Sequence, residues 1–245
     1  MFSFRQRILV TLAALLGSAV LTTLPAFAEE DARSPCTEDA MLVFDASGSM
    51  SGNGWGYGSE NPTAVSRIDK VRLALAKILP RITRMRRVGL ITYGPGPYDQ
   101  CNVQLDLRPT PSAAGPILDA VRGLTPAGQT PLSEAVAQAA EVLDYRAKPG
   151  LIVVLTDGEE TCQGKPCELG RELHAQAFQL TIHVIGLRVK GLTWTGEQSV
   201  VETQCLAKEN GGIYVAVDTE KELESALAKT LGCPMLTEAT GADPF

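Results

Sequence analysis

Two carboxylates and three hydroxyls stand in three short segments of this chain whose residue types suit cation binding. Asp45-Ala46-Ser47-Gly48-Ser49 places one carboxylate and two hydroxyls at alternate positions on a turn that contains glycine. Thr156-Asp157-Gly158 supplies a second carboxylate, and Gly128-Gln129-Thr130-Pro131-Leu132 places a hydroxyl directly before a proline. All five side chains offer hard oxygen ligands, the kind that Mg²⁺, Mn²⁺ or Ca²⁺ prefers.

Mg²⁺ suits this set best, because it keeps several waters and needs few direct carboxylates. Neutral hydroxyl ligands would leave the cation attractive to an external anion, so an Asp or Glu of a partner protein could complete its coordination shell. Each segment also has an explanation without metal: the serines as turn residues, Asp157 as a turn or helix cap, and Thr130-Pro131 as a helix start. Three such segments in one chain favour the metal site.

The elements that must position these residues follow from the hydrophobic pattern. Short aliphatic runs alternate with amphipathic segments, which predicts a mostly parallel sheet covered by helices. Residues 151–155 are apolar throughout, so we expect this strand in the centre of the sheet. The predicted strands are Ala40–Asp45, Arg87–Tyr93, Val103–Leu107, Leu151–Thr156, Thr181–Leu187 and Ile213–Val217. The predicted helices are Ile68–Leu79, Ala113–Val121, Leu132–Leu143, Cys167–Phe178, Glu197–Glu209 and Glu220–Leu231.

The order of these elements places the two carboxylates at one edge of the sheet. Ligands of open α/β sheets bind at the carboxyl ends of the strands. Asp45 ends the first predicted strand and Asp157 follows the fourth. Residues 94–102 are too few for a crossover helix, so the third strand is expected to run antiparallel to the second.

The D-x-S-x-S segment, the T-P loop and the T-D-G segment resemble the metal-ion-dependent adhesion site (MIDAS) of von Willebrand factor A (VWA) and integrin I domains. The resemblance covers nearly the whole chain after residue 28. It implies a doubly wound, Rossmann-like three-layer α/β sandwich, with helices on both faces of a six-stranded, mostly parallel sheet. The implied strand order is 3-2-1-4-5-6, with strand 3 antiparallel. The implied metal ligands are Asp45, Ser47, Ser49, Thr130 and Asp157.

Other segments narrow the resemblance and suggest a surface around the metal. Tyr93-Gly94, Cys101, residues 156–162 and Cys205-Leu206-Ala207 resemble a bacterial secreted subgroup of these domains. A glycine-rich stretch, 51–66, is inserted before the first helix. Its aromatic side chains either form a partner-binding rim, since exposed aromatics anchor interfaces, or pack back on the domain. The predicted rim residues are Trp55, Tyr57, Glu159 and Glu160.

The N-terminal segment has the pattern of a secretory signal. Residues 1–28 combine Arg5 and Arg7, an apolar run over 8–24 and an Ala26-Phe27-Ala28 cleavage site. A retained membrane anchor is the alternative, but no stop-transfer segment follows. We therefore expect export to the periplasm or outside a bacterium, with no membrane insertion after cleavage. The predicted organisation is a signal peptide over 1–28, a lead-in over 29–35, a VWA domain over 36–233 and a disordered tail over 234–245.

The charge and the motifs favour a non-enzymatic protein-binding module. The net charge of −6 argues against nucleic acid or an anionic membrane surface as the ligand. A structural subunit of an exported assembly is one alternative, and a metal-dependent hydrolase is another. Against the hydrolase, the sequence shows neither a Ser-His-Asp set nor a Walker-type phosphate loop. His174 and His183 lie in apolar patterns and are assigned to the fold.

The six cysteines form an even set, which predicts disulfides in an exported chain. Zinc is the alternative for the C-x4-C pair Cys162 and Cys167, although a four-ligand set is hard to assemble with the two histidines. The same two cysteines bracket a short, turn-rich span, so we predict that they pair.

Two further pairings remain to be assigned. Cys36 and Cys233 are both expected at the end of the sheet opposite the metal, so their pairing would close the domain at its termini. Cys101 and Cys205 are left over and are expected far apart. Either they pair with each other, or they stay reduced, or Cys101 instead pairs with a cysteine of the 162–167 region.

Overall fold

The computed structural model describes residues 36, 38–52, 65–97, 100–187 and 196–233. All of these belong to one unit of the chain, Arg33–Phe245, and the other unit, Met1–Ala32, lies outside them. The signal peptide, the lead-in, the tail, and the aromatic residues Trp55 and Tyr57 also fall outside the described residues. The interpretations of those segments stay predictions.

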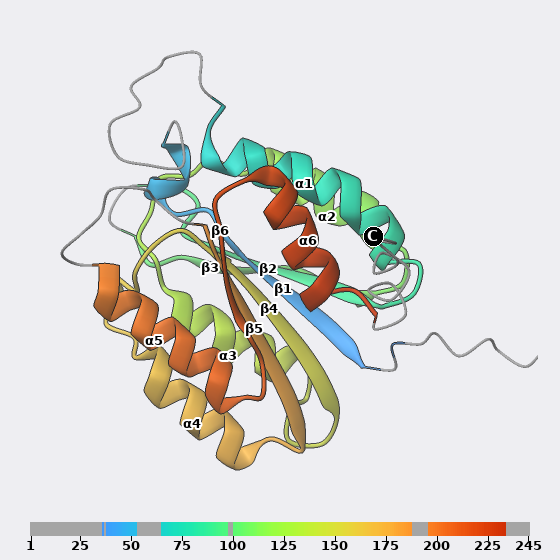
Figure 1. The fold of residues 1–245 in the computed structure, drawn as a ribbon, viewed down its shortest axis with the longest axis vertical. Helices are drawn as coiled ribbons and strands as arrows, with labels where there is room; N and C mark the ends of the chain where they lie inside the picture. The colour runs from blue at the N-terminus through green and yellow to red at the C-terminus, as the bar shows by residue number, and fades with distance from the viewer. Residues whose placement is uncertain (1–35, 37, 53–64, 98–99, 188–195, 234–245) are drawn as a thin grey trace, which may run out of the picture. The chain divides into compact units, whose positions relative to one another are not determined.

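Six strands form one sheet in the order β3-β2-β1-β4-β5-β6 (Figure 1). Neighbouring strands are parallel except for β2 and β3, which are antiparallel. Both features confirm the predicted topology, and β4 lies in the interior of the sheet as expected. The strands are β1 (Asp39–Asp45), β2 (Val88–Tyr93), β3 (Val103–Thr110), β4 (Pro149–Thr156), β5 (Gln179–Leu187) and β6 (Tyr214–Val217).

The helices follow the predicted segments closely. They are α1 (Arg67–Ile82), α2 (Ala114–Gly123), α3 (Leu132–Val142), α4 (Pro166–Gln176), α5 (Gly196–Glu209) and α6 (Glu220–Thr230), with a short 3-10 helix η1 (Gly48–Ser51). The predicted end of α1 at Leu79 is too early: Pro80 forgoes only one backbone hydrogen bond and Ile82 is buried, so the helix continues. Among the described residues, no helix is long and apolar enough to cross a membrane.

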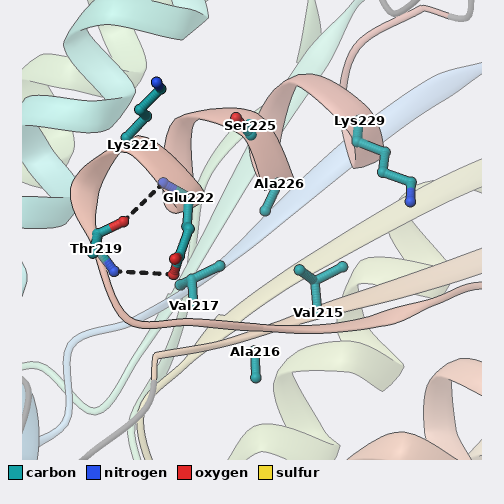
Figure 2. A pocket seen from close by; sticks show the side chains of 9 residues that line it. All are labelled: Val215, Ala216, Val217, Thr219, Lys221, Glu222, Ser225, Ala226 and Lys229. Carbon is teal, nitrogen blue, oxygen red and sulfur yellow. Dashed lines mark hydrogen bonds between the residues drawn. The ribbon is translucent and has the colours of Figure 1, made fainter.

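Local capping explains where two of these helices begin. The hydroxyl of Ser66 accepts a hydrogen bond from the Asp69 N–H at the start of α1. At the start of α6, Thr219 and Glu222 form a capping box, in which each side chain accepts a hydrogen bond from the other residue's backbone (Figure 2). These caps fix the positions at which α1 and α6 leave the sheet.

Two hydrophobic layers cover the sheet, because successive side chains of a strand point to opposite faces. Helices α1, α2 and α6 cover one face of the sheet, and α3, α4 and α5 cover the other (Figure 1). On β1, Leu42 and Phe44 pack in the first layer, whereas Met41 and Val43 pack in the second. Full burial of each such side chain contributes about 1.5–3 kcal/mol. The three-layer α/β sandwich is therefore confirmed.

Three disulfides join all six cysteines: Cys36–Cys233, Cys101–Cys162 and Cys167–Cys205. The terminal pairing is confirmed. The predicted Cys162–Cys167 bridge is wrong, and the alternative that joins Cys101 to this region is the one observed. No cysteine thiolate is left to bind zinc.

The helix packing explains the correction. Cys167 lies in the first turn of α4, which packs against α5, the helix that carries Cys205. Gly170 permits this close approach, because a Cβ there would lie 3.1 Å from the Leu206 Cα. Cys162 instead lies on the loop after β4, beside the loop that joins β2 to β3.

Candidate metal site

Asp45, the last residue of β1, is fully buried and joins two loops. Its Oδ1 accepts a hydrogen bond from the Ser47 N–H at 2.8 Å. Its Oδ2 accepts from the Thr156 hydroxyl at 3.0 Å and from the Asp157 N–H at 3.4 Å. Burial raises the pKa of Asp45, and hydrogen bonds from Ser47 and Thr156 partly offset this rise.

A chain of hydroxyls connects this loop to Asp157. The Oγ atoms of Ser47 and Ser49 lie 3.0 Å apart, and the Ser49 hydroxyl donates to Asp157 Oδ1 at 2.6 Å. Ser49 is exposed, so the group opens to solvent. Burial, followed by the charge of Asp45, raises the pKa of Asp157 to about 6, against the lowering effects of Ser49 and Arg67. Four of the five predicted ligands thus form one hydrogen-bonded group.

Arg67, in the first turn of α1, is a member of this site that the sequence did not indicate. Its Nη1 lies 2.8 Å from Asp157 Oδ2 and donates to the backbone oxygen of Ser49 at 2.6 Å. The side chain is buried. Because its carboxylate partner is 90 positions away in the sequence, no local pattern could have identified the ion pair.

The Thr130 loop lies beside Ser47, but the hydrogen bonds that place it run through backbone atoms. Ser47 and Gly128 form an isolated parallel bridge, and the Gly48 N–H donates to the Gly128 oxygen at 3.0 Å. The Thr130 N–H donates to Thr161 Oγ1 at 2.8 Å, which ties the loop to the segment after β4. Thr130 is buried at this junction, and the role of its hydroxyl as a ligand stays a prediction.

Gly94 allows these loops to converge. Its φ is +73°, and a Cβ at this position would lie 2.7 Å from Ser47 N and 2.6 Å from Gln129 O. A side chain would therefore push apart the β1, β2 and Thr130 loops. The close approach of these loops thus explains why glycine follows Tyr93 in the Tyr93-Gly94 pair that resembles the secreted subgroup.

The two predicted rim glutamates differ in their surroundings. Glu160 accepts hydrogen bonds from the Ser133 N–H and from the Cys162 N–H, both at 2.8 Å. It therefore ties the β4–α4 loop to the start of α3. Glu159 is half-buried beside it. For both residues, contact with a partner stays a prediction.

Comparison with known proteins agrees with this architecture. Residues 40–160 match the family model of the von Willebrand factor type A domain, from β1 to the loop that carries Asp157 and Glu160. The chain therefore contains a von Willebrand factor type A domain. The matched range contains all five predicted metal ligands.

Relatives and solved structures extend the likeness beyond that range. The uncharacterized protein YwmC of Bacillus subtilis (strain 168) is 27% identical over 216 residues, which cover 82% of this chain and 87% of YwmC. The D319A mutant of the PilB minor pilin from Streptococcus sanguinis shares the fold with a TM-score of 0.59 at 16% identity, covering 84% of this chain and 63% of PilB. A von Willebrand factor type A protein from Catenulispora acidiphila has a TM-score of 0.54 at 17% identity, covering 79% and 42%.

The donor chemistry of this VWA domain fits a hard divalent cation. Two carboxylates with raised pKa values lie at one buried edge, and a cation there would relieve their mutual repulsion and their desolvation. Among the described residues, no three His, Cys, Asp or Glu side chains cluster as a metal site. A cation would therefore rely on hydroxyls and waters beside the two carboxylates. Mg²⁺ accepts such a shell, and Zn²⁺ does not favour it.

Proposed function

We propose that this chain is an exported, non-enzymatic VWA module that binds a carboxylate of a partner protein through Mg²⁺, or through Mn²⁺ or Ca²⁺ in its place. The observation that carries the proposal is the continuous group formed by Asp45, Ser47, Ser49 and Asp157 at the carboxyl ends of β1 and β4. A cation bound there supplies electrostatic attraction for an incoming Asp or Glu. The residues that would hold it are Asp45, Ser47, Ser49, Thr130 and Asp157.

The charge balance of the site supports capture of an anion. Asp45 and Asp157 carry two negative charges, and Arg67 contributes one positive charge directly against Asp157. A bound dication would leave the site with an excess of positive charge, because the hydroxyls are neutral. The exposed Ser49 marks the side on which this charge faces solvent. An incoming carboxylate would neutralise it.

The surroundings support binding rather than catalysis. The chain has two histidines: His174 lies on α4, and His183 lies on β5 with its Nδ1 accepting the Ile213 N–H. Neither belongs to the oxygen group, so the serines of the site have no adjacent imidazole base of the kind that activates a nucleophile. The three disulfides support an oxidising, exported location. The fold shared with a minor pilin fits a role in protein binding.

The test is capture of a partner from a periplasmic or secreted-protein extract by the immobilised chain. We expect capture in Mg²⁺ that is lost in EDTA and lost in Asp45→Ala. Asp106→Ala is the matched control, since Asp106 lies on edge strand β3 and bonds Thr92 instead of the site. A complex that survives EDTA with unchanged affinity would contradict the cation mechanism and favour an assembly subunit. Turnover of a generic phosphoester that Asp45→Ala abolishes would favour the hydrolase.

A further inference from the structure

A cavity of about 790 Å³ lies under α6 at the amino ends of the strands, opposite the edge that carries Asp45 and Asp157. We name it the α6 cavity. Its wall combines the end of α1, the start of β4, the middle of β5 and one side of α6. The charged and titratable residues that line it are Glu38, Arg81, Arg86, His183, Lys221, Glu224 and Lys229.

Arg86 is a buried cation with an unsatisfied donor in the wall of this cavity. The residue is 5% exposed, and its two Nη atoms reach the backbone oxygen and the Oε1 of Glu38 at 3.4 and 3.3 Å. These are long hydrogen bonds. Among the described residues, Arg86 Nε has no hydrogen-bond partner. A buried donor without an acceptor costs about 1–3 kcal/mol, so an acceptor inside the cavity would be favourable.

His183 offers a second donor to the same space. Its Nδ1 accepts the Ile213 N–H at 3.0 Å, so the proton of the neutral imidazole resides on Nε2. Burial lowers the pKa of His183, and the positive charges of Arg86 and Lys229 lower it further. The two cations therefore act on the imidazole together, from the α1–β2 turn and from α6.

The remaining charges leave the cavity positive in a chain that carries a net charge of −6. Its two carboxylates already have partners, since Glu38 pairs with Arg86, and Glu224 pairs with Lys77 outside the lining. Lys229 is exposed near the end of α6, and Figure 2 shows its side chain leaving the helix away from that of Lys221. Arg81 adds an exposed cation from the last turn of α1.

We propose that the α6 cavity binds a compact oxyanion, a carboxylate or a phosphate, through Arg86, His183 and Lys229. The buried guanidinium and the imidazole would donate hydrogen bonds, and Lys229 would add charge at the open side. Charge-assisted hydrogen bonds of this kind are the strong ones in proteins. The site is separate from the proposed cation site and does not depend on it.

The test is isothermal titration calorimetry of the full chain with sodium phosphate and, separately, sodium acetate. The chain is first stripped of cations with EDTA and then dialysed into metal-free, EDTA-free buffer, so that no cation can bind anions at the other edge and the chelator's own carboxylates cannot compete. NaCl holds the ionic strength constant. We expect one anion site. The anion that binds with the lower Kd shows whether the natural ligand offers a phosphate or a carboxylate. Lys229→Glu should weaken binding by about tenfold or more, because it replaces attraction with repulsion.

Matched variants separate a built site from a general salt effect. Arg84→Glu makes an equal charge reversal at an exposed position that does not line the cavity, and it should leave the affinity unchanged. Arg86→Met should abolish binding. Arg86 also pairs with Glu38, so Arg86→Met could lower stability as well as affinity. The melting curve of Arg86→Met is therefore compared with that of Lys229→Glu, which leaves the Arg86–Glu38 pair intact. Absence of binding to wild type, or equal losses in Lys229→Glu and Arg84→Glu, would overturn the proposal.

Discussion

At the scale of single residues, the site consists of two buried carboxylates whose charge is only partly balanced. Asp45 accepts hydrogen bonds from Ser47, Thr156 and the Asp157 N–H, whereas Asp157 is paired with the guanidinium of Arg67. A buried carboxylate is costly unless it is paired, so this edge of the sheet should respond to any cation that reaches it.

Mg²⁺ or Mn²⁺ should raise the melting temperature of the wild-type chain, and Asp45→Ala or Asp157→Ala should remove the rise. A ligand that binds only the folded state stabilises it, by about 2.7 kcal/mol at a concentration one hundred times Kd. Thermal melting with Mg²⁺ and with EDTA measures the effect. Glu159→Ala is the control, since it removes a neighbouring half-buried carboxylate outside the hydrogen-bonded group. Equal stabilisation of the mutants and the wild type would refute these carboxylates as ligands.

Arg67→Met should tighten Mg²⁺ binding by about tenfold while lowering the stability of the metal-free chain. The guanidinium occupies Asp157 Oδ2 and would repel a nearby dication, so its removal favours the metal. Without metal, the same change leaves the buried Asp157 without its cationic partner. Calorimetric titration with Mg²⁺ measures the first effect and denaturant unfolding the second. Arg67→Lys keeps the charge and should retain near wild-type affinity; weaker metal binding by Arg67→Met would instead show that Arg67 mainly orients Asp157.

At the scale of elements, the Cys101–Cys162 disulfide holds together two loops that flank the site. Its Cα atoms lie 6.0 Å apart. Gln100, next to Cys101, accepts the Gln129 N–H at 2.9 Å, and Thr161, next to Cys162, accepts the Thr130 N–H at 2.8 Å. The disulfide therefore links the two segments to which the Thr130 loop is hydrogen-bonded.

Cys101→Ser with Cys162→Ser should weaken Mg²⁺ binding several-fold, because the Thr130 loop would lose part of its preorganisation. Calorimetry at a temperature where the variant remains folded gives the affinity. Cys167→Ser with Cys205→Ser is the matched control: it also removes one disulfide, but that disulfide joins α4 to α5 away from the oxygen group. If both double variants lose affinity equally, the effect is one of global stability and not of loop position.

At the scale of the whole domain, Cys36–Cys233 joins positions 197 residues apart, before the first strand and after the last helix. Strand β1 lies in the interior of the sheet and α6 packs against α1, so the two ends of the domain lie close enough to be joined. Closing so long a loop restricts the unfolded chain, on the chain-entropy account of disulfides.

Cys36→Ser with Cys233→Ser should lower the free energy of unfolding by about 5 kcal/mol on that account. It should leave the Mg²⁺ affinity of the folded chain unchanged, because the disulfide lies at the end of the sheet opposite the oxygen group. Denaturant unfolding and calorimetry measure the two quantities. Non-reducing peptide mapping is the accompanying check, and a Cys36 peptide linked to any cysteine other than Cys233 would contradict the pairing.

The amino-acid sequence by itself determined the elements and the candidate ligands. A strand buried on both faces must be apolar throughout, as residues 151–155 are, and a helix that covers a sheet must repeat its apolar side chains every three or four residues. Asp45, Ser47 and Ser49 could also be identified as candidate ligands from the sequence, because they alternate within five consecutive positions on one turn. Given parallel strands, their placement at the same edge as Asp157 followed from the order of the elements.

The tertiary structure alone decided which distant side chains meet. Arg67 pairs with Asp157 because α1 begins beside the loop that follows β4. Neither segment carries a sequence pattern that indicates the other. Cys162 faces Cys101 instead of its neighbour Cys167, since α4 turns Cys167 toward α5. The α6 cavity likewise collects Arg86, His183 and Lys229 from three separate elements. Local periodicity reports which face of an element is buried, but contacts between loops depend on strand register and helix packing, which exist only once the whole sheet has formed.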